Sequence, residues 1–296
     1  MSKINSLIAE RMSLIKPSPT MAVTKLAAEM KAAGKDVIGL GAGEPDFDTP
    51  DHIKNAAITA IKNGETKYTA VDGTPALKKA IVNKFSRDNN IEYNMDEIIV
   101  SVGGKQVLYN ALMSSINPGD EVIIPSPYWV SYPDMVALAG GIPIIVEGKE
   151  SNNFKVIPDD IKNKISDKTK WIIINSPSNP TGSSYTKSEL EDLGNLLLNH
   201  ENIFIMSDDI YEKIIYDDFK FYSLAEVVPA LKDRILTVNG VSKAYAMTGW
   251  RIGYAGGPKE LISSMAKLQS QSTSNPSSIS QAAALAALEG PEEFLS

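Results

Sequence analysis

The chain has 296 residues, a formal net charge of −7, 43% hydrophobic residues, 22% charged residues and no cysteine. This length exceeds one minimal core and predicts one large domain with part of another, and the composition is that of a globular protein. The negative charge argues against nucleic acid or a membrane surface as a partner. The lack of cysteine excludes disulfides, thiolate metal sites and cysteine nucleophiles within this chain. No metal site is expected, since His52 and His200, the only histidines, lie far apart in the sequence.

The N-terminal part of the chain is predicted to be helical and then extended. Prolines 17 and 19 separate two helices, because proline disfavours helix in the residue before it. Ser18 or Thr20 can cap the second helix, and Gly34 closes it. The polar N-terminus and the absence of a long apolar run predict a cytoplasmic location. The predicted elements are helices at 2–15 and about 20–31, a strand at 37–40 and a loop at 41–48.

From residue 51 onward, helical and strand patterns alternate along the chain. The predicted helices are 51–62, 75–88, 105–115, 129–139, 187–199, 258–270 and 277–289. The predicted strands are 98–102, 121–124, 142–146, 171–175, 203–207, 235–238 and 252–255. Such alternation is typical of an α/β sheet covered by helices on both faces. Ligands of these sheets bind beyond the carboxyl ends of the strands, which is where the candidate residues described below fall.

Residues 235–257 contain a lysine and an arginine directly after an apolar strand. The strand is predicted to stop at the turn-forming pair Asn239-Gly240, and Lys243 follows at once. Desolvation there favours the neutral amine that attacks carbonyls, and Arg251 offers a fork of donors suited to phosphate. A pyridoxal-phosphate site requires this pair of functions. The structural alternative is a solvated loop lysine and an arginine that serves only as an ion-pair partner.

Two further segments offer phosphate and ring contacts. Gly104 and Lys105 lie between a strand and a helix, so free backbone N–H groups and the helix dipole can hold a phosphate. The alternative is a plain strand–helix turn, and the spacing is not that of a P-loop. Tyr128 and Trp129 can place an aromatic face against a planar ring, with core packing as the alternative.

Three polar side chains follow two other predicted strands. The Ser176–Gly182 loop contains two prolines and presents the Asn179 amide, unless it is turn chemistry alone. Asp208 stands at a strand end, where a carboxylate can keep a pyridine nitrogen protonated. Tyr211 is predicted on the same side of a helical turn and can donate to a phenolic oxygen. The alternative is that Asp208 or Asp209 caps a helix.

Together these segments resemble the fold-type I pyridoxal-phosphate aminotransferases, specifically the class I aspartate aminotransferases of the bacterial subgroup. The matching pieces keep the family's order over almost the whole chain, and the last of them is highly specific. They are GAGEPDFDTP (41–50), KYTAVDGTPAL (67–77), SVGGKQ (101–106), PSPYWVSYP (125–133), NSPSNPTG (175–182), SDDIYE (207–212) and SKAYAMTGWRIGYAGGP (242–258). The resemblance implies a mostly parallel sheet with helices on both faces, plus an incomplete small domain.

The resemblance implies pyridoxal 5′-phosphate as cofactor and assigns its central contacts. Lys243 would be the catalytic lysine that bonds the cofactor, and Arg251 would anchor the phosphate. Asp208 would pair with the pyridine nitrogen, and Tyr211 and Asn179 with the phenolic oxygen. Many relatives carry a phosphate-binding serine or threonine three residues before the lysine. Glycine stands there in this chain, so phosphate binding would depend more on the arginine and the backbone.

The resemblance also implies contacts from other segments. The backbone of Gly104 and Lys105 would meet the phosphate, and Trp129 would stack on the ring. The substrate would meet Gly43, Trp129 and Asn179. Tyr68 would reach the phosphate of the neighbouring subunit in a homodimer. Lys16 looks like the position that some members use to accept prephenate.

The implied activity moves an amino group between aspartate or glutamate and a 2-oxo acid such as 2-oxoglutarate, oxaloacetate or prephenate. Residues 1–47 would begin a small domain, and 48–296 would form the large cofactor-binding domain. Family members continue further and supply an arginine for the substrate carboxylate, so a C-terminally truncated chain is expected. The alternatives are another pyridoxal-phosphate reaction such as β-elimination, an inactive fragment that binds cofactor, and a cofactor-free Schiff-base lysine enzyme.

Overall fold

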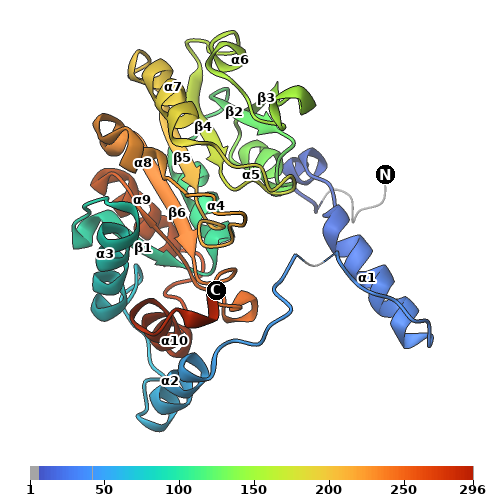
Figure 1. The fold of residues 1–296 in the computed structure, drawn as a ribbon, viewed down its shortest axis with the longest axis vertical. Coiled ribbons are helices and arrows are strands. Elements are labelled where there is room, and N and C mark those ends of the chain that lie inside the picture. The colour runs from blue at the N-terminus through green and yellow to red at the C-terminus, as the bar shows by residue number, and fades with distance from the viewer. Residues whose placement is uncertain (1–6, 42, 296) are drawn as a thin grey trace.

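A central seven-stranded sheet organises the computed structural model, which describes residues 7–41 and 43–295 (Figure 1). The strand order is β1-β7-β6-β5-β4-β2-β3. The strands are β1 (Ile98–Ser101), β2 (Glu121–Ser126), β3 (Ile142–Glu147), β4 (Thr169–Asn175), β5 (Phe204–Asp208), β6 (Ile235–Gly240) and β7 (Gly253–Gly256).

The sheet is mostly parallel, as predicted. Strands β3, β2, β4, β5 and β6 pair in parallel, whereas β7 runs antiparallel to both of its neighbours, β6 and β1. Strand β1 therefore points in the same direction as β6. The carboxyl ends of the parallel strands meet along one edge, so the segments that leave β4, β5 and β6 are brought together there.

Helices cover both faces of this sheet, because alternate strand residues face opposite sides. Trp171 and Ile173 of β4 belong to one apolar cluster with α4, α5 and α9, whereas Ile172 and Ile174 belong to another with α2, α3, α7 and α10. The helices are α1 (Pro19–Ala32), α2 (Asp51–Lys62), α3 (Pro75–Asn89), α4 (Gly104–Ser115), α5 (Ser131–Leu138), α6 (Pro158–Lys162), α7 (Lys187–Leu198), α8 (Leu224–Val227), α9 (Lys259–Ser270) and α10 (Ser278–Glu289). Short 3₁₀ helices are η1 (Glu10–Leu14), η2 (Met95–Glu97), η3 (Glu150–Asn152), η4 (Pro229–Arg234), η5 (Thr248–Trp250) and η6 (Glu293–Leu295).

In the parts of the chain that the structure describes, no helix combines the length and apolar character needed to cross a bilayer.

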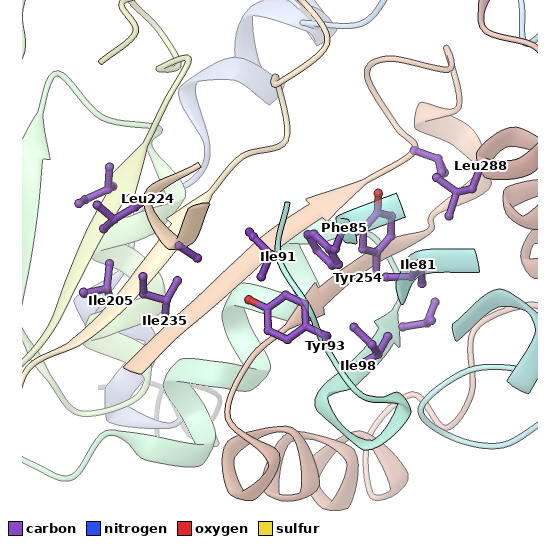
Figure 2. Packing of buried hydrophobic residues seen from close by; sticks show 14 of the residues in the cluster. Ile81, Phe85, Ile91, Tyr93, Ile98, Ile205, Leu224, Ile235, Tyr254 and Leu288 are labelled. Carbon is purple, nitrogen blue, oxygen red and sulfur yellow. The ribbon is translucent and has the colours of Figure 1, made fainter. Parts of the chain in front are cut away.

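Figure 2 shows how the larger apolar cluster joins α3 to the sheet. The ring of Phe85 in α3 meets Tyr93 edge to face at 5.1 Å and Tyr254 of β7 at 5.8 Å between centroids. All three rings are buried. These contacts hold α3 firmly against the sheet, a point that matters for the residues near its C-terminal end.

The N-terminal part differs from the prediction. Residues 2–6 of the predicted first helix lie outside the described residues, and within 7–15 only the short η1 forms. The predicted strand at 37–40 is wrong, since these residues have no strand assignment and Ile38 and Leu40 are 84% and 89% exposed. A strand needs a hydrogen-bonded neighbour, and no described segment pairs with this one. Helix α1 matches its prediction but contains no buried residue and projects from the body (Figure 1).

The predicted end of the sixth strand was also wrong. Strand β6 continues through the predicted turn Asn239-Gly240, because these two residues pair with Tyr254 and Gly253 of β7. Sequence turn signals were overridden here by an antiparallel neighbour far along the chain. Every other predicted strand and helix from residue 51 to 289 matches an observed one within a few residues, whereas α6, α8 and the 3₁₀ helices were not predicted.

Candidate active site

A cleft of ≈ 510 Å³ opens at the carboxyl edge of the sheet. Its walls come from the N-terminal segment, the start of α4, the segment before α5 and the segments that follow β4, β5 and β6. The predicted site residues in its lining are Gly43, Gly104, Lys105, Trp129, Asn179, Asp208, Tyr211, Lys243 and Arg251. The fold therefore brings together residues that are spread over 209 positions of the sequence, from 43 to 251.

Asp208 is a buried carboxylate at the end of the central strand β5. It is 5% exposed, and its Oδ2 accepts a hydrogen bond of 2.6 Å from the Tyr132 hydroxyl. Burial raises the pKa of Asp208 to about 6, against the hydrogen bonds from Tyr132 and the Ile210 N–H and the charge of Lys243. No helix follows directly, since residues 209–213 form hydrogen-bonded turns, so the helix-cap alternative does not apply.

Tyr211 and Asn179 form a polar pair beside this carboxylate. The Asn179 side-chain amide donates to the Tyr211 hydroxyl over 3.4 Å, and the Asn179 N–H donates to Asn175 Oδ1 over 2.8 Å. Burial, followed by the charge of Asp208, raises the pKa of Tyr211. The protonated Tyr211 phenol and the Asn179 amide thus lie side by side in the cleft wall, where both can donate hydrogen bonds to a ligand oxygen.

Lys243 is half-buried and faces the cleft from the segment after β6. Its Nζ donates to the Gly43 carbonyl over 2.6 Å and lies 5.9 Å from the centroid of the Tyr211 ring. Burial lowers the pKa of the Lys243 amine, while the charges of Glu44 and Asp208 oppose that change. The environment therefore favours the neutral amine more than water does, as the sequence predicted, and the structure does not show a freely solvated lysine.

Two positive side chains and the N-terminus of α4 lie together in the cleft lining. Arg251 donates to the Thr248 carbonyl over 2.8 Å and forms no ion pair among the described residues. A Cβ built on Gly103 would lie 2.4 Å from Arg251 Nη2, so the glycine, at φ +84°, admits the guanidinium. Helix α4 begins at Gly104, and burial, followed by the Arg251 charge, lowers the pKa of Lys105. This arrangement suits an anion.

Trp129 packs in the core and also lines the cleft. Its ring meets Tyr132 edge to face at 5.3 Å and packs against the apolar cluster of α4 and α5. The same ring lines the cleft and holds the Lys105 ammonium 4.7 Å from its centroid. Trp129 is thus an aromatic wall held in place by its neighbours.

The N-terminal segment contributes contacts that the sequence did not predict. Besides the bond from Lys243 to Gly43, the Thr248 hydroxyl donates to Glu44 Oε2 over 3.0 Å. Thr49 donates its hydroxyl to the Ala246 carbonyl over 2.6 Å. Residues 43–49 are therefore tied to the loop that carries the lysine.

Two predicted site residues lie elsewhere. Tyr68 is 90% exposed and borders a separate surface hollow with residues of the α9–α10 connection. Lys16 is exposed between η1 and α1 and does not line the cleft. The cleft of this single chain therefore forms without either side chain.

The cleft also includes residues to which no role was assigned from the sequence. Tyr132 holds the Asp208 carboxylate, the Asn175 amide donates to the Asp208 carbonyl over 2.9 Å, and Ser242 lines the cleft next to Lys243. All three lie inside the segments that carry the family resemblance. Only their three-dimensional partners give them a role.

The raised acid pKa values predict how stability depends on pH. Burial raises the pKa of Asp209, as of Asp208, above the ordinary 3.8, in its case to about 7. Each carboxyl therefore keeps its proton to a higher pH in the folded chain than in the unfolded one. Their contribution to the free energy of unfolding should fall as pH rises from about 4 to about 7 and then stay constant.

Asp209→Asn tests this contribution in denaturant unfolding at about pH 4.5 and about pH 7.5, without added cofactor. Because the amide does not titrate, the variant should lose less stability between these two pH values than the wild-type chain, by on the order of 2 kcal/mol. An equal loss in both proteins would contradict the buried-acid assignment.

Comparisons with known proteins identify the family to which this chain belongs. A family model described as "Aminotransferase class I and II" matches residues 35–296. The chain belongs to this family. It is thus an aminotransferase, as the sequence segments predicted. Its sheet and helices are those of the fold-type I enzymes.

Curated relatives and solved structures agree with this membership. The chain is 62% identical over 290 residues to the probable aspartate/prephenate aminotransferase of Rickettsia conorii, and 59% identical to the aspartate/prephenate aminotransferase of Cereibacter sphaeroides; each alignment covers 98% of this chain and 72% of the relative. The aspartate aminotransferase structure from Rhizobium meliloti superposes with a TM-score of 0.94 at 55% identity, covering 97% of this chain and 72% of that one. The Thermus thermophilus aspartate aminotransferase with maleate gives 0.92 at 46%, covering 95% and 72%.

Proposed function

We propose that this aminotransferase uses pyridoxal 5′-phosphate, held in the cleft at the carboxyl edge of the sheet. The observation that carries the proposal is the convergence of Lys243, Asp208, Tyr211 and Arg251 on one cleft. Asp208 ends β5, Tyr211 follows it, and Lys243 and Arg251 lie between β6 and β7, and each residue offers a different kind of group. No single one of them would support the proposal alone.

The chemistry of the lining fits the parts of this cofactor. Its phosphate would lie against Arg251 and the N-terminus of α4 at Gly104 and Lys105, which form the positive end of the cleft. Its pyridine nitrogen would meet Asp208. Its phenolic oxygen would meet the donors of Tyr211 and Asn179. The Trp129 ring offers a flat wall to the pyridine, and the Lys243 amine is the group that bonds an aldehyde.

When bound, the cofactor supplies an electron sink for the bond that is broken at the substrate Cα. The protein supplies the rest. The Asp208 carboxylate holds a proton on the pyridine nitrogen, and the Tyr132 hydroxyl keeps that carboxylate oriented. The amine of Lys243, whose pKa burial lowers, moves a proton at the substrate Cα. Such general acid–base catalysis contributes ~10²–10⁴-fold.

We propose that the substrates are aspartate or glutamate and a 2-oxo acid such as 2-oxoglutarate, oxaloacetate or prephenate. The names of the Rickettsia and Cereibacter relatives and the maleate complex of the Thermus enzyme, which contains a dicarboxylate, support this choice. Gly43, Trp129 and Asn179 would contact the substrate, and Lys16 would act in prephenate acceptance. Among the described cleft residues Arg251 is the one arginine, so the substrate carboxylate would need a further partner.

We propose further that residues 1–47 belong to a small domain and 48–296 to the large one, and that two subunits share their active sites. The absence of buried residues in α1 and the exposure of Leu40 support a small domain completed by other chain segments. The exposed Tyr68 side chain is available to a neighbouring subunit's phosphate site. A cytoplasmic location stays a prediction.

Absorption spectroscopy with added pyridoxal phosphate tests the cofactor assignment. The expected result is a visible band that borohydride fixes onto the protein, with the label recovered on the peptide that contains Lys243. A folded chain that shows no band, or a label on another lysine, would overturn the proposed site.

Product analysis separates transamination from the rival reaction on the same fold. With aspartate and 2-oxoglutarate, transamination delivers the amino group to glutamate without release of ammonia. β-Elimination needs a leaving group at Cβ, which aspartate lacks, so serine is the second test substrate: loss of its hydroxyl as water, followed by hydrolysis, would release pyruvate and ammonia. Ammonia release from serine without formation of glutamate from aspartate and 2-oxoglutarate would exclude transamination as the main reaction.

A further inference from the structure

Three buried polar residues lie behind the cleft, on the face of the sheet that α3 covers. They are Lys84 and Asn89 of α3 and Glu212, which follows Tyr211, and they are 1%, 1% and 7% exposed. We call these residues the α3 anchor. None of them lines the cleft, and the proposed function assigns none of them a role.

The α3 anchor is a closed hydrogen-bonded triangle. Lys84 Nζ forms an ion pair with Glu212 Oε1 and donates to Asn89 Oδ1 over 2.7 Å. The Asn89 amide donates to Glu212 Oε2 over 2.9 Å. Both carboxylate oxygens therefore have a donor, so the position of the Glu212 side chain is set from two directions.

The α3 anchor is connected to the cleft through the backbone, because one of its residues directly follows a cleft residue. Glu212 is the residue after Tyr211, and its N–H donates to the Asp209 carbonyl over 2.9 Å, which closes a turn that starts at Asp209, the residue after Asp208. Among the residues that the structure describes, the Tyr211 hydroxyl has one hydrogen bond, of 3.4 Å from the Asn179 amide. The location of the phenol therefore depends on the backbone of this turn, which Glu212 ties to α3.

A buried ion pair is weak evidence for stability, because desolvation offsets its attraction and apolar pairs of similar size often serve as well. Helix α3 is already held on the sheet by Phe85 and its aromatic neighbours (Figure 2). The neighbouring Lys213 also bonds to the end of α3, at 3.2 Å from Asp88 Oδ2, in a less buried position. The α3 anchor adds a fixed position for the Glu212 side chain, and this side chain links the turn to α3.

We propose that Lys84, Asn89 and Glu212 are positioning residues that set Tyr211 and Asp208 against the cofactor by clamping the turn between them to α3. This inference rests on the proposed cofactor site. It assigns to the anchor an effect on cofactor affinity that is separate from its effect on stability.

The decisive comparison uses three variants of the chain. Glu212→Gln removes the charge that Lys84 binds. Lys84→Met with Glu212→Leu replaces the ion pair by apolar side chains, so that no charge is left buried without a partner, although the buried Asn89 side chain loses its two partners. Glu97→Gln is the matched control, since Glu97, the last residue of η2, forms a partly buried ion pair with Lys232 at 3.1 Å and does not line the cleft.

Pyridoxal-phosphate affinity, the pH at which the visible band of the bound cofactor changes, and amide exchange are measured on each variant. Glu212→Gln and the double variant should lose affinity about tenfold and shift the pH response, since a misplaced contact weakens an oriented site. The Glu212 and Ile214 N–H groups close two consecutive turns, by donating to the carbonyls of Asp209 and Tyr211, and their exchange should accelerate about tenfold. The control should match the wild-type chain in all three.

The outcomes separate this inference from the proposed function. A double variant that melts like the wild type, and also binds and exchanges like it, would show that the anchor is only structural. Failure of the wild-type chain to bind cofactor would refute the proposed site. The exchange rates of the variants would still show whether the α3 anchor holds the turn. If the double variant does not fold, Glu212→Asp decides in the same way, because it keeps the charge and shortens the arm.

Discussion

Lys243→Ala is expected to abolish covalent attachment of pyridoxal phosphate and to remove transamination. The amine that bonds the aldehyde is also the group that moves the proton at the substrate Cα, and the loss of proton transfer alone costs ~10²–10⁴-fold. The fold should persist, because Lys243 is half-buried and its one hydrogen bond among the described residues, to the Gly43 carbonyl, contributes about 1 kcal/mol. Borohydride labelling, peptide mapping and a melting curve of the same preparation provide the measurement.

Lys105→Ala is the matched control for this variant. Lys105 lies in the same cleft and burial lowers its pKa as well, but it faces the positive end near Arg251. Its loss should weaken cofactor affinity and leave the label on Lys243 at saturating cofactor. A label that survives Lys243→Ala and disappears in Lys105→Ala would show that Lys105, and not Lys243, bonds the cofactor.

Asp208→Asn is expected to keep the fold and the bound cofactor but to reduce turnover by about 10²–10³-fold, the usual cost of losing one electrostatic contact to developing charge. Asparagine keeps the volume and can still accept the hydrogen bond from Tyr132, so only the charge is removed. Turnover with aspartate and 2-oxoglutarate, compared with cofactor affinity, is the measurement. Undiminished turnover would count against a partner role for this carboxylate.

Asp209→Asn is the control for Asp208→Asn. Asp209 is equally buried and adjacent, but it does not line the cleft, and its Oδ1 accepts a hydrogen bond from Ser207 at 2.7 Å. We expect this variant to retain turnover while its stability responds less to pH. Similar losses in both variants would indicate that the local fold, not the charge at the cleft, carries the effect.

Sequence patterns alone predict the α/β class, most elements from residue 51 onward and the central members of the cleft. Strand ends followed by Lys243, Asp208 and Asn179 were visible because apolar runs of strand length stop at polar, chemically distinctive residues. Parallel strands place such ends along one edge, so co-location followed from the sheet class. The family segments then named the chemistry, and the family model confirmed the membership.

The tertiary structure alone decided features that depend on distant partners. Strand β6 passes through the turn-like Asn239-Gly240 because β7 pairs with it, whereas residues 37–40 have strand-like composition but no neighbour among the described residues. The role of Tyr132 at Asp208 depends on a contact between residues 76 positions apart. The α3 anchor likewise joins Asn89 and Glu212, 123 positions apart. Local propensity carries no information about such pairs, because their energy comes from packing and hydrogen bonds that exist only once the sheet has formed.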